Sequence, residues 1–148
     1  MNSLSKTIEY LFKETDVFFI SSVDENGYPH TKAMLAPRRR DGIGKIFFTS
    51  AHSSRKAVQY LRNPKANLYL CDRKSFKGLM LLGEMEVSDD PMLKKALWKS
   101  GDELFHPGGI SDPDYCVLIF TPRSGRFYHD ISSDDFTIKD GKPETRVL

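Results

Sequence analysis

The sequence alternates strand-like runs with turns, but helical patterns separate only some of those runs. About seven short runs rich in apolar, β-branched and aromatic residues occur, at residues 17–23, 29–36, 45–49, 66–72, 78–88, 115–122 and 124–130. Helical periodicity is found at residues 3–15, 53–61 and 91–105. A doubly wound parallel sheet needs a helix after nearly every strand, and this order lacks them. We therefore predict a mostly β, α+β fold: an antiparallel barrel of about six or seven strands with flanking helices.

Local turn signals support this order of elements. Asp24-Glu25-Asn26-Gly27 lies between the first two runs and is a strong hairpin signal. Run 78–88 begins apolar on both faces and alternates only later, which is expected of a strand in the middle of a sheet. We predict one domain over residues 1–131, followed by a polar tail over residues 132–148.

Composition excludes several classes of protein. Of the 148 residues, 39% are hydrophobic and 28% are charged, as in soluble globular proteins. A formal net charge of +2 is too small for a nucleic-acid binder, and the basic run Arg38–Arg40 beside Asp41 is predicted to be a solvated loop. The sequence lacks an apolar run of the roughly 18 residues needed to span a membrane, and its first residues lack the pattern of a signal peptide. We therefore expect no nucleic-acid partner and no membrane partner.

The two cysteines indicate the compartment. Cys71 and Cys116 lie in apolar surroundings far apart in sequence, which is typical of buried free thiols in a cytoplasmic protein. No Cys/His cluster has the spacing of metal ligands, so we expect no metal site. A small barrel fills its interior with side chains, and any ligand should bind outside it, in a cleft or at a subunit contact.

The turn between the third strand-like run and the second helical pattern carries hydroxyls and cations. Thr49, Ser53, Ser54, Arg55 and Lys56 lie together where a helix begins. The first amides of a helix and its dipole favour an anion, and Arg and Lys side chains match phosphate oxygens. The turn is either a phosphate cradle or a solvated basic patch, because Arg and Lys are usually exposed.

Lys32 presents a similar choice, since its neighbours Ala33, Met34 and Leu35 look buried. Its ammonium group either reaches water at a sheet edge or faces a ligand anion. The histidines have no acid–base partner that spacing can identify, and surface or loop positions are predicted for His30, His52, His106 and His129. Trp98 is predicted to be a core residue.

The stretch "FFTSAHSSRKAVQYLRNPKANLYL", followed by "GLMLLGEMEV", resembles the flavin mononucleotide (FMN) segment of the pyridoxamine 5'-phosphate oxidase-like split-barrel family. The resemblance covers residues 5–130 and is nearest to the short general stress protein 26-like branch. It implies an FMN-binding split β-barrel that forms a homodimer, with two flavins at the subunit interface.

The resemblance also implies the cofactor-binding residues. Arg55 and Lys56 of the "SRK" motif correspond to the residues that hold the flavin phosphate, with Ser53 and Ser54 just before them. The remaining contacts implied by position are Lys32, Ala33, Met34, Phe48, Thr49, Gly78 and Tyr128. Gly78 stands where the true oxidases carry Gln, and Tyr128 stands where they usually carry Trp.

The activity implied is electron or hydride transfer to a small reducible compound. The C-terminal segment with Arg and His that binds substrate in the true oxidases has no match in "ISSDDFTIKDGKPETRVL", so oxidation of pyridoxamine phosphate is not expected. The alternative is a non-enzymatic flavin-binding or stress-response protein. The residues themselves identify no catalytic side chain.

Overall fold

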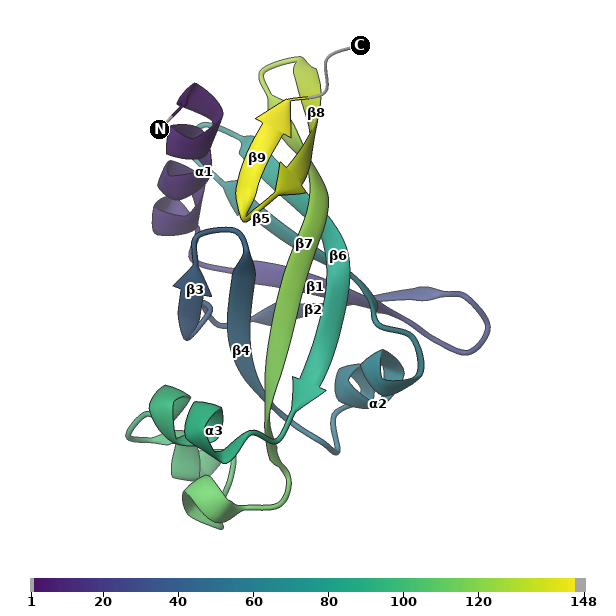
Figure 1. Ribbon diagram of the computed structural model, residues 1–148, viewed down its shortest axis with the longest axis vertical. Coiled ribbons are helices and arrows are strands. Elements are labelled where there is room, and N and C mark those ends of the chain that lie inside the picture. The colour runs from purple at the N-terminus through teal and green to yellow at the C-terminus, as the bar shows by residue number, and fades with distance from the viewer. Residues whose placement is uncertain (1, 146–148) are drawn as a thin grey trace.

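A computed structural model describes residues 2–145 of the chain (Figure 1). The helices are α1 (Ser3–Glu14), α2 (Arg55–Arg62) and α3 (Pro91–Leu97), and two short 3-10 turns are η1 (Asp102–Leu104) and η2 (Gly109–Ser111). The strands are β1 (Phe18–Val23), β2 (Pro29–Met34), β3 (Arg39–Asp41), β4 (Lys45–Ala51), β5 (Lys65–Asp72), β6 (Lys77–Ser88), β7 (Tyr115–His129), β8 (Ser132–Lys139) and β9 (Lys142–Thr145). Within these residues, no helix is long and apolar enough to cross a membrane.

The strands form one antiparallel sheet of nine strands. Their order is β2-β1-β5-β6-β7-β4-β3, and β8 and β9 continue from β7. Because β2 and β3 end this order and do not pair with each other in the described part of the chain, the barrel is split and not closed. Figure 1 shows β6 and β7 side by side along the length of the molecule, with α1 near one end and α2 and α3 near the other. The predicted fold class is confirmed, and β6 lies between two neighbours as its apolar pattern indicated.

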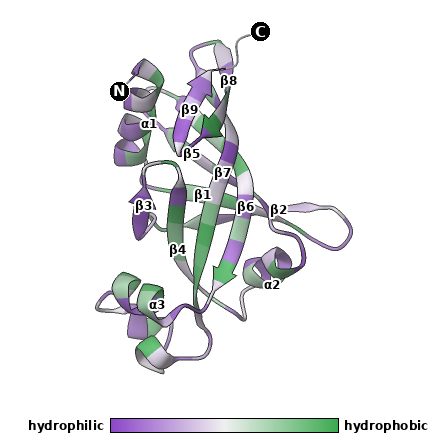
Figure 2. Cartoon of the chain, viewed as in Figure 1, coloured by the Kyte–Doolittle hydropathy of each residue, from purple (hydrophilic) through white to green (hydrophobic). Residues whose placement is uncertain are grey.

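Apolar side chains fill the inside of the split barrel. Every second residue of β5 is buried along its whole length, which is the pattern of a strand with one face on a core. The fully buried side chains include Phe18, Phe48, Leu68, Leu79 and Phe120, each from a different strand. Figure 2 shows hydrophobic residues along β4 and β7 and mainly hydrophilic ones on β3 and β9. A core packed in this way leaves the outer surface for ligand binding.

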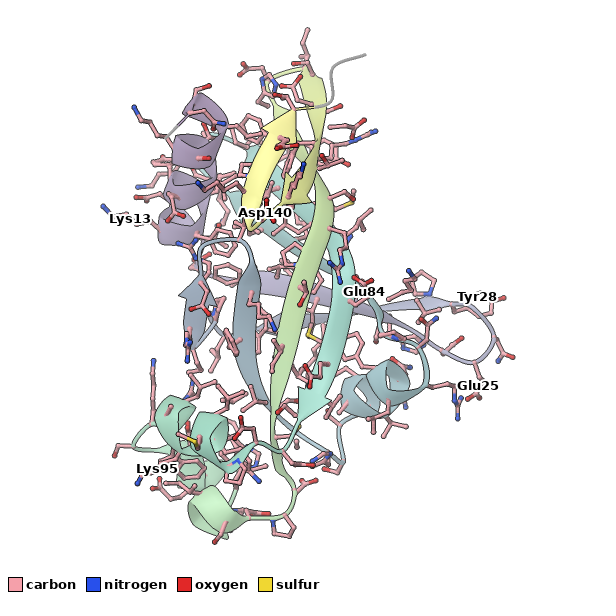
Figure 3. The ribbon with its side chains drawn as sticks, viewed as in Figure 1. Lys13, Glu25, Tyr28, Glu84, Lys95 and Asp140 are labelled. Atoms are coloured by element: carbon pink, nitrogen blue, oxygen red, sulfur yellow. The ribbon has the colours of Figure 1, made fainter. Side chains whose placement is uncertain are left out.

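The predicted hairpin turn joins β1 to β2. The Asp24 carboxylate accepts hydrogen bonds from the backbone amides of Asn26 and Tyr28, both at 2.9 Å, and Gly27 adopts the left-handed conformation with φ 84°. Figure 3 shows Glu25 and Tyr28 at the tip of this hairpin, which projects away from the barrel. The hairpin therefore extends β2 as an exposed edge strand beyond the core.

The last two predicted strands are one continuous strand, β7. The register between β6 and β7 shifts between Leu82 and Gly83, and Arg123 is the additional residue on β7. This β-bulge accommodates Pro122, which would interrupt a regular ladder. Gly83 faces the bulge at close range, since a Cβ atom there would lie 2.1 Å from the carbonyl oxygen of Thr121. The prediction of two strands is wrong because a bulge keeps the strand continuous past its proline.

The prediction of a polar tail over residues 132–148 is wrong for the part that the structure describes. β8 and β9 form a hairpin on β7, and the Phe136 side chain is only 1% exposed in the core. Gly125 makes room for it, because a Cβ atom there would lie 2.4 Å from the Phe136 ring. Asp140-Gly141, both with positive φ, form the turn. Residues 146–148 lie outside the described part of the chain.

The prediction of a solvated loop at Arg38–Arg40 is also wrong. Arg39 and Arg40 belong to β3 and pair with β4. The Arg40 guanidinium forms an ion pair with Glu9 of α1 at 2.6 Å and lies over the Phe12 ring. These partners are distant in sequence, so the run of three arginines alone could not reveal them.

Helix α3 is shorter than the helix predicted over residues 91–105. It ends at Leu97, because Trp98 adopts an extended conformation with ψ 135°. Gly101, with φ 100°, then leads into the turn η1. The segment between α3 and β7 is therefore mostly loop, and it lies near the end of β4 in Figure 1.

Candidate functional site

A cleft of about 350 Å³ lies between β2, β4 and the start of α2, with a further wall from the segment after α3. Its lining residues are Lys32, Ala33, Met34, Leu35, Ala36, Arg38, Phe48, Thr49, Ser50, Ala51, Ser54, Lys56, Asp102, Phe105 and His106. A second cavity, of about 220 Å³, shares Lys32, Ser54 and Lys56 with the cleft and adds Arg55. The fold thus brings most of the predicted site residues to one place.

Two lysines give the cleft its charge. Burial lowers the pKa of Lys56, and the positive charge of Lys32 lowers it further. Among residues 2–145, no acidic side chain forms an ion pair with either lysine. The sequence left two positions open for Lys32, a sheet edge open to water or a place facing a ligand. Lys32 lies on the edge strand β2 and also lines the cleft, so the structure is compatible with both. Two neighbouring cations without a counter-charge disfavour each other's charged form, and an anion between them would reduce this repulsion.

The turn before α2 uses its hydroxyl groups internally. Ser54 Oγ caps the helix by accepting a hydrogen bond from Ala57 N, and it donates to Ala51 O at 2.7 Å. The amide and the hydroxyl of Ser53 both donate to the Asp114 carboxylate at 2.8 Å, and these bonds lower the pKa of Asp114. The two serines therefore shape the turn, and direct contact of their hydroxyls with a ligand stays a prediction.

Arg55, by contrast, has an exposed guanidinium group in the first turn of α2. It lines the second cavity beside Lys32 and Lys56. No hydrogen bond or ion pair of its side chain to residues 2–145 holds it in place, so the planar fork is available to an anion near the helix start.

A buried ion pair forms part of the cleft wall that sequence reasoning missed. The Arg38 guanidinium donates to both carboxylate oxygens of Asp102 at 2.8 Å and to Leu97 O at 3.0 Å. Lys99 N donates to the same carboxylate. The hydrogen bonds from Arg38 lower the pKa of Asp102, and those to Asp102 raise the pKa of Arg38. The two residues are far apart in the chain, and no sequence signal links them.

His106 is a further cleft residue that was missed. It lies in a loop, as predicted, but it is buried, with 5% of its surface exposed. Its ring lies 4.9 Å from the Tyr115 ring and 6.2 Å from the Trp98 ring, measured between centroids. Trp98 itself is half-buried and packs edge-on against Tyr115, at the border of the core.

The other histidines lie outside the cleft. Each is partly exposed and within hydrogen-bond distance of a carboxylate: His30 with Asp24, His52 with Asp89 and His129 with Asp134. No group of three or more His, Cys, Asp or Glu side chains in residues 2–145 is arranged to hold a metal ion.

Gly78 and Tyr128 do not line the cleft. They are paired across β6 and β7, and the Tyr128 ring packs near the Tyr69 ring at 6.4 Å. A Cβ atom at Gly78 would lie 2.2 Å from the hydroxyl of Tyr69, so a larger residue would displace that ring. Within one chain, these two predicted contacts are separate from the rest of the predicted site.

The arrangement has counterparts among known proteins. A family model for pyridoxamine 5'-phosphate oxidase matches residues 4–129. The chain belongs to the pyridoxamine 5'-phosphate oxidase family. The match spans the cleft, both sides of the ion pair and the "SRK" turn, and it confirms the family resemblance predicted from that turn. A search of curated proteins gives no match.

Solved structures agree with this family assignment. A protein related to general stress protein 26 of B. subtilis (pyridoxinephosphate oxidase family), from Clostridium acetobutylicum, is 33% identical with a TM-score of 0.82, covering 94% of this chain and 97% of its own. General stress protein 26 from Bacillus anthracis is 19% identical with a TM-score of 0.72, covering 89% of this chain and 98% of its own. A pyridoxamine 5'-phosphate oxidase-related, FMN-binding protein from Nostoc punctiforme is 12% identical with a TM-score of 0.71, covering 100% of this chain and 98% of its own. The last two show likeness of fold.

Proposed function

We propose that the cleft binds FMN, with the flavin phosphate at Lys32, Arg55 and Lys56. The observation that carries this proposal is the partly buried Lys56 ammonium group, which neighbours Lys32 without an acidic partner among the described residues. A phosphate dianion would relieve this repulsion through charge-assisted hydrogen bonds. The start of α2 adds a dipole that favours an anion. A relative in this family is named as FMN-binding, which supports the choice of ligand.

The rest of the cleft suits the ring and ribityl chain of the same cofactor. β2 contributes Ala33 and Met34, and β4 contributes Phe48 and Thr49. These walls combine apolar surface with strand backbone, and sites of this kind bury planar ligands and fix their orientation. Bound FMN would supply electron or hydride transfer, while this chain binds and orients the ring.

We further propose that the protein is a homodimer with flavin at the subunit interface. Apolar side chains remain exposed beside the cleft, with Leu35 72% exposed and Phe105 68% exposed. A second subunit would cover them. The dimer would also explain Gly78 and Tyr128, which lie away from the cleft of their own chain and would face the flavin of the other subunit. A folded monomer that still binds FMN at micromolar concentration in sedimentation would refute this arrangement.

The proposed activity is oxidation or reduction of a small compound. One observation favours the alternative, a non-enzymatic flavin-binding stress protein: Asp102, the one carboxylate of the cleft among the described residues, is already occupied by Arg38 and the Lys99 amide. That carboxylate is unavailable as an acid or base.

We propose that the protein is cytoplasmic. Cys71 and Cys116 are free thiols, which suits a reducing compartment. Burial raises the pKa of Cys116 to about 12, so this thiol is protonated and unreactive at neutral pH.

The test begins with the purified protein and its visible spectrum. Titration with FMN and with riboflavin, followed by tryptophan and flavin fluorescence, should show tighter binding of FMN, since only FMN carries the phosphate. Turnover of NADH or NADPH with a quinone or a nitro compound then separates the oxidoreductase from the non-enzymatic alternative. Equal affinity for riboflavin and FMN would refute the phosphate site, and lack of binding of either would refute the flavin proposal.

A further inference from the structure

The His106 imidazole has a buried nitrogen without a hydrogen-bond partner. His106 Nδ1 is the one buried side-chain nitrogen or oxygen in residues 2–145 that makes no hydrogen bond. Leaving such an atom unpaired is costly, and native proteins seldom do so outside functional sites. His106 also lines the cleft. The position of the unpaired atom therefore points to a partner that arrives with a ligand.

The His106 imidazole lies in an aromatic cluster, and two hydrogen bonds hold the backbone of the same residue. Its backbone amide donates to Asp102 O at 2.9 Å, and its carbonyl accepts from Gly109 N at 2.9 Å. Its ring packs against the Tyr115 ring at 4.9 Å and near the Trp98 ring. The imidazole therefore has Tyr115 of β7 and Trp98 of the segment after α3 as its aromatic neighbours.

The polar groups nearby already have partners of their own. The Tyr115 hydroxyl donates to Lys94 O at 2.7 Å. The Asp102 carboxylate accepts from Arg38 and from Lys99 N. Neither group forms a hydrogen bond with Nδ1. A residue in the wall of the cleft thus carries a buried polar atom without a hydrogen-bond partner in residues 2–145.

The cleft has positive charge in one region and a polar group, the imidazole of His106, in another. The cations Lys32 and Lys56 lie where β2 meets the start of α2. His106 belongs to the segment after α3, and in Figure 1 α2 and α3 lie on opposite sides of the lower end of β4. The other lining residues include the apolar Met34 and Phe48. A ligand that satisfies all three regions has an anionic end, a planar apolar body and a polar edge.

We propose that His106 recognises the ring of the bound flavin, through a hydrogen bond between Nδ1 and the pyrimidine edge of the isoalloxazine. This inference rests on the proposed function, because it requires FMN in the cleft. The pyrimidine edge carries carbonyl and N–H groups, whereas the opposite edge carries methyl groups that cannot pair with Nδ1. His106 is then a specificity-determining residue for the ring, as Lys56 is for the phosphate.

The test compares His106→Phe with His106→Asn in the full chain. Phe keeps a ring against Tyr115 but has no polar atom, whereas the Asn amide places one near the position of Nδ1. Loss of one hydrogen bond should weaken binding about three- to tenfold. His106→Phe should therefore weaken FMN and riboflavin by the same factor, since both carry the ring, and His106→Asn should restore most of the affinity for both. A Lys56 variant should instead weaken FMN alone.

The control is Trp98→Phe, which alters the same aromatic cluster at a residue that does not itself line the cleft. It should leave both affinities unchanged. Thermal melting of the apo-proteins shows whether each variant is folded. If wild type binds FMN and folded His106→Phe binds both flavins as tightly, the His106 proposal is wrong while the proposed function stands. If wild type binds neither flavin, both proposals are wrong.

Discussion

Replacing Lys56 with Met removes one positive charge from the cleft and keeps most of the apolar stem. Exposed ion pairs contribute about 0–1 kcal/mol, but hydrogen bonds to charged groups shielded from water contribute about 1.5–3 kcal/mol. Lys56 is partly buried, and burial lowers its pKa, so the larger figure applies. We expect Lys56→Met to weaken FMN about ten- to a hundredfold and riboflavin hardly at all. The apo-protein should keep its stability within about 0.5 kcal/mol, because the charge that is lost has no partner within residues 2–145.

The assay is fluorescence titration of both flavins against wild type, Lys56→Met and a control, Lys45→Met. Lys45 is exposed at the other end of β4 and does not line the cleft. Binding of the phosphate favours the charged ammonium, so affinity for FMN should fall as pH rises through the pKa of free Lys56. Burial and Lys32 lower that pKa, so the decline should begin at a lower pH than for an ordinary lysine. Equal losses for FMN and riboflavin, or none for either, would show that Lys56 does not hold the phosphate.

Four further outcomes are expected. Arg55→Lys should weaken FMN more than riboflavin in the same titration, because a point charge cannot replace the guanidinium fork. Arg38→Met should lower the free energy of unfolding in urea by about 3–5 kcal/mol at pH 7, since it leaves Asp102 buried without its cation; the difference should shrink only at acid pH, as the lowered pKa of Asp102 is reached. Gly83→Ala should cost about 1–3 kcal/mol in the same assay through its clash with Thr121, and an unchanged midpoint would contradict the bulge geometry. Pyridoxamine phosphate should not be oxidised measurably by the FMN-loaded protein, and saturable turnover at low micromolar substrate would disprove this.

Features that depend on neighbouring residues could be predicted from the sequence. The hairpin turn is stabilised by hydrogen bonds from nearby backbone amides to Asp24, and the start of α2 by a hydrogen bond from Ala57 N to Ser54. The position of β6 inside the sheet follows from its two apolar faces. The "SRK" turn was recognised for the same reason, because its cations and its helix start are consecutive in the chain.

Features that depend on distant partners were mispredicted. Residues 132–145 look polar because only one face of the β8–β9 hairpin meets the core, where Phe136 is buried and Ile138 packs against the same cluster. The continuity of β7 depends on Gly83 of another strand, which lies opposite Pro122 and allows the bulge. The sequence pattern of a single strand therefore reveals neither the core contact of the β8–β9 hairpin nor the bulge in β7.

The part of the site that could not be predicted comes from one segment, between α3 and β7. This segment contributes Asp102 and His106 to the cleft wall, and its last residue before β7, Asp114, accepts both hydrogen bonds from Ser53 at the turn before α2. Its sequence has no helical or strand periodicity, because its side chains contact separate partners and do not line one common face. The same segment therefore forms one wall of the cleft and fixes the turn that presents Lys56. A change in this loop should affect recognition of both the ring and the phosphate, although the "SRK" turn itself is untouched.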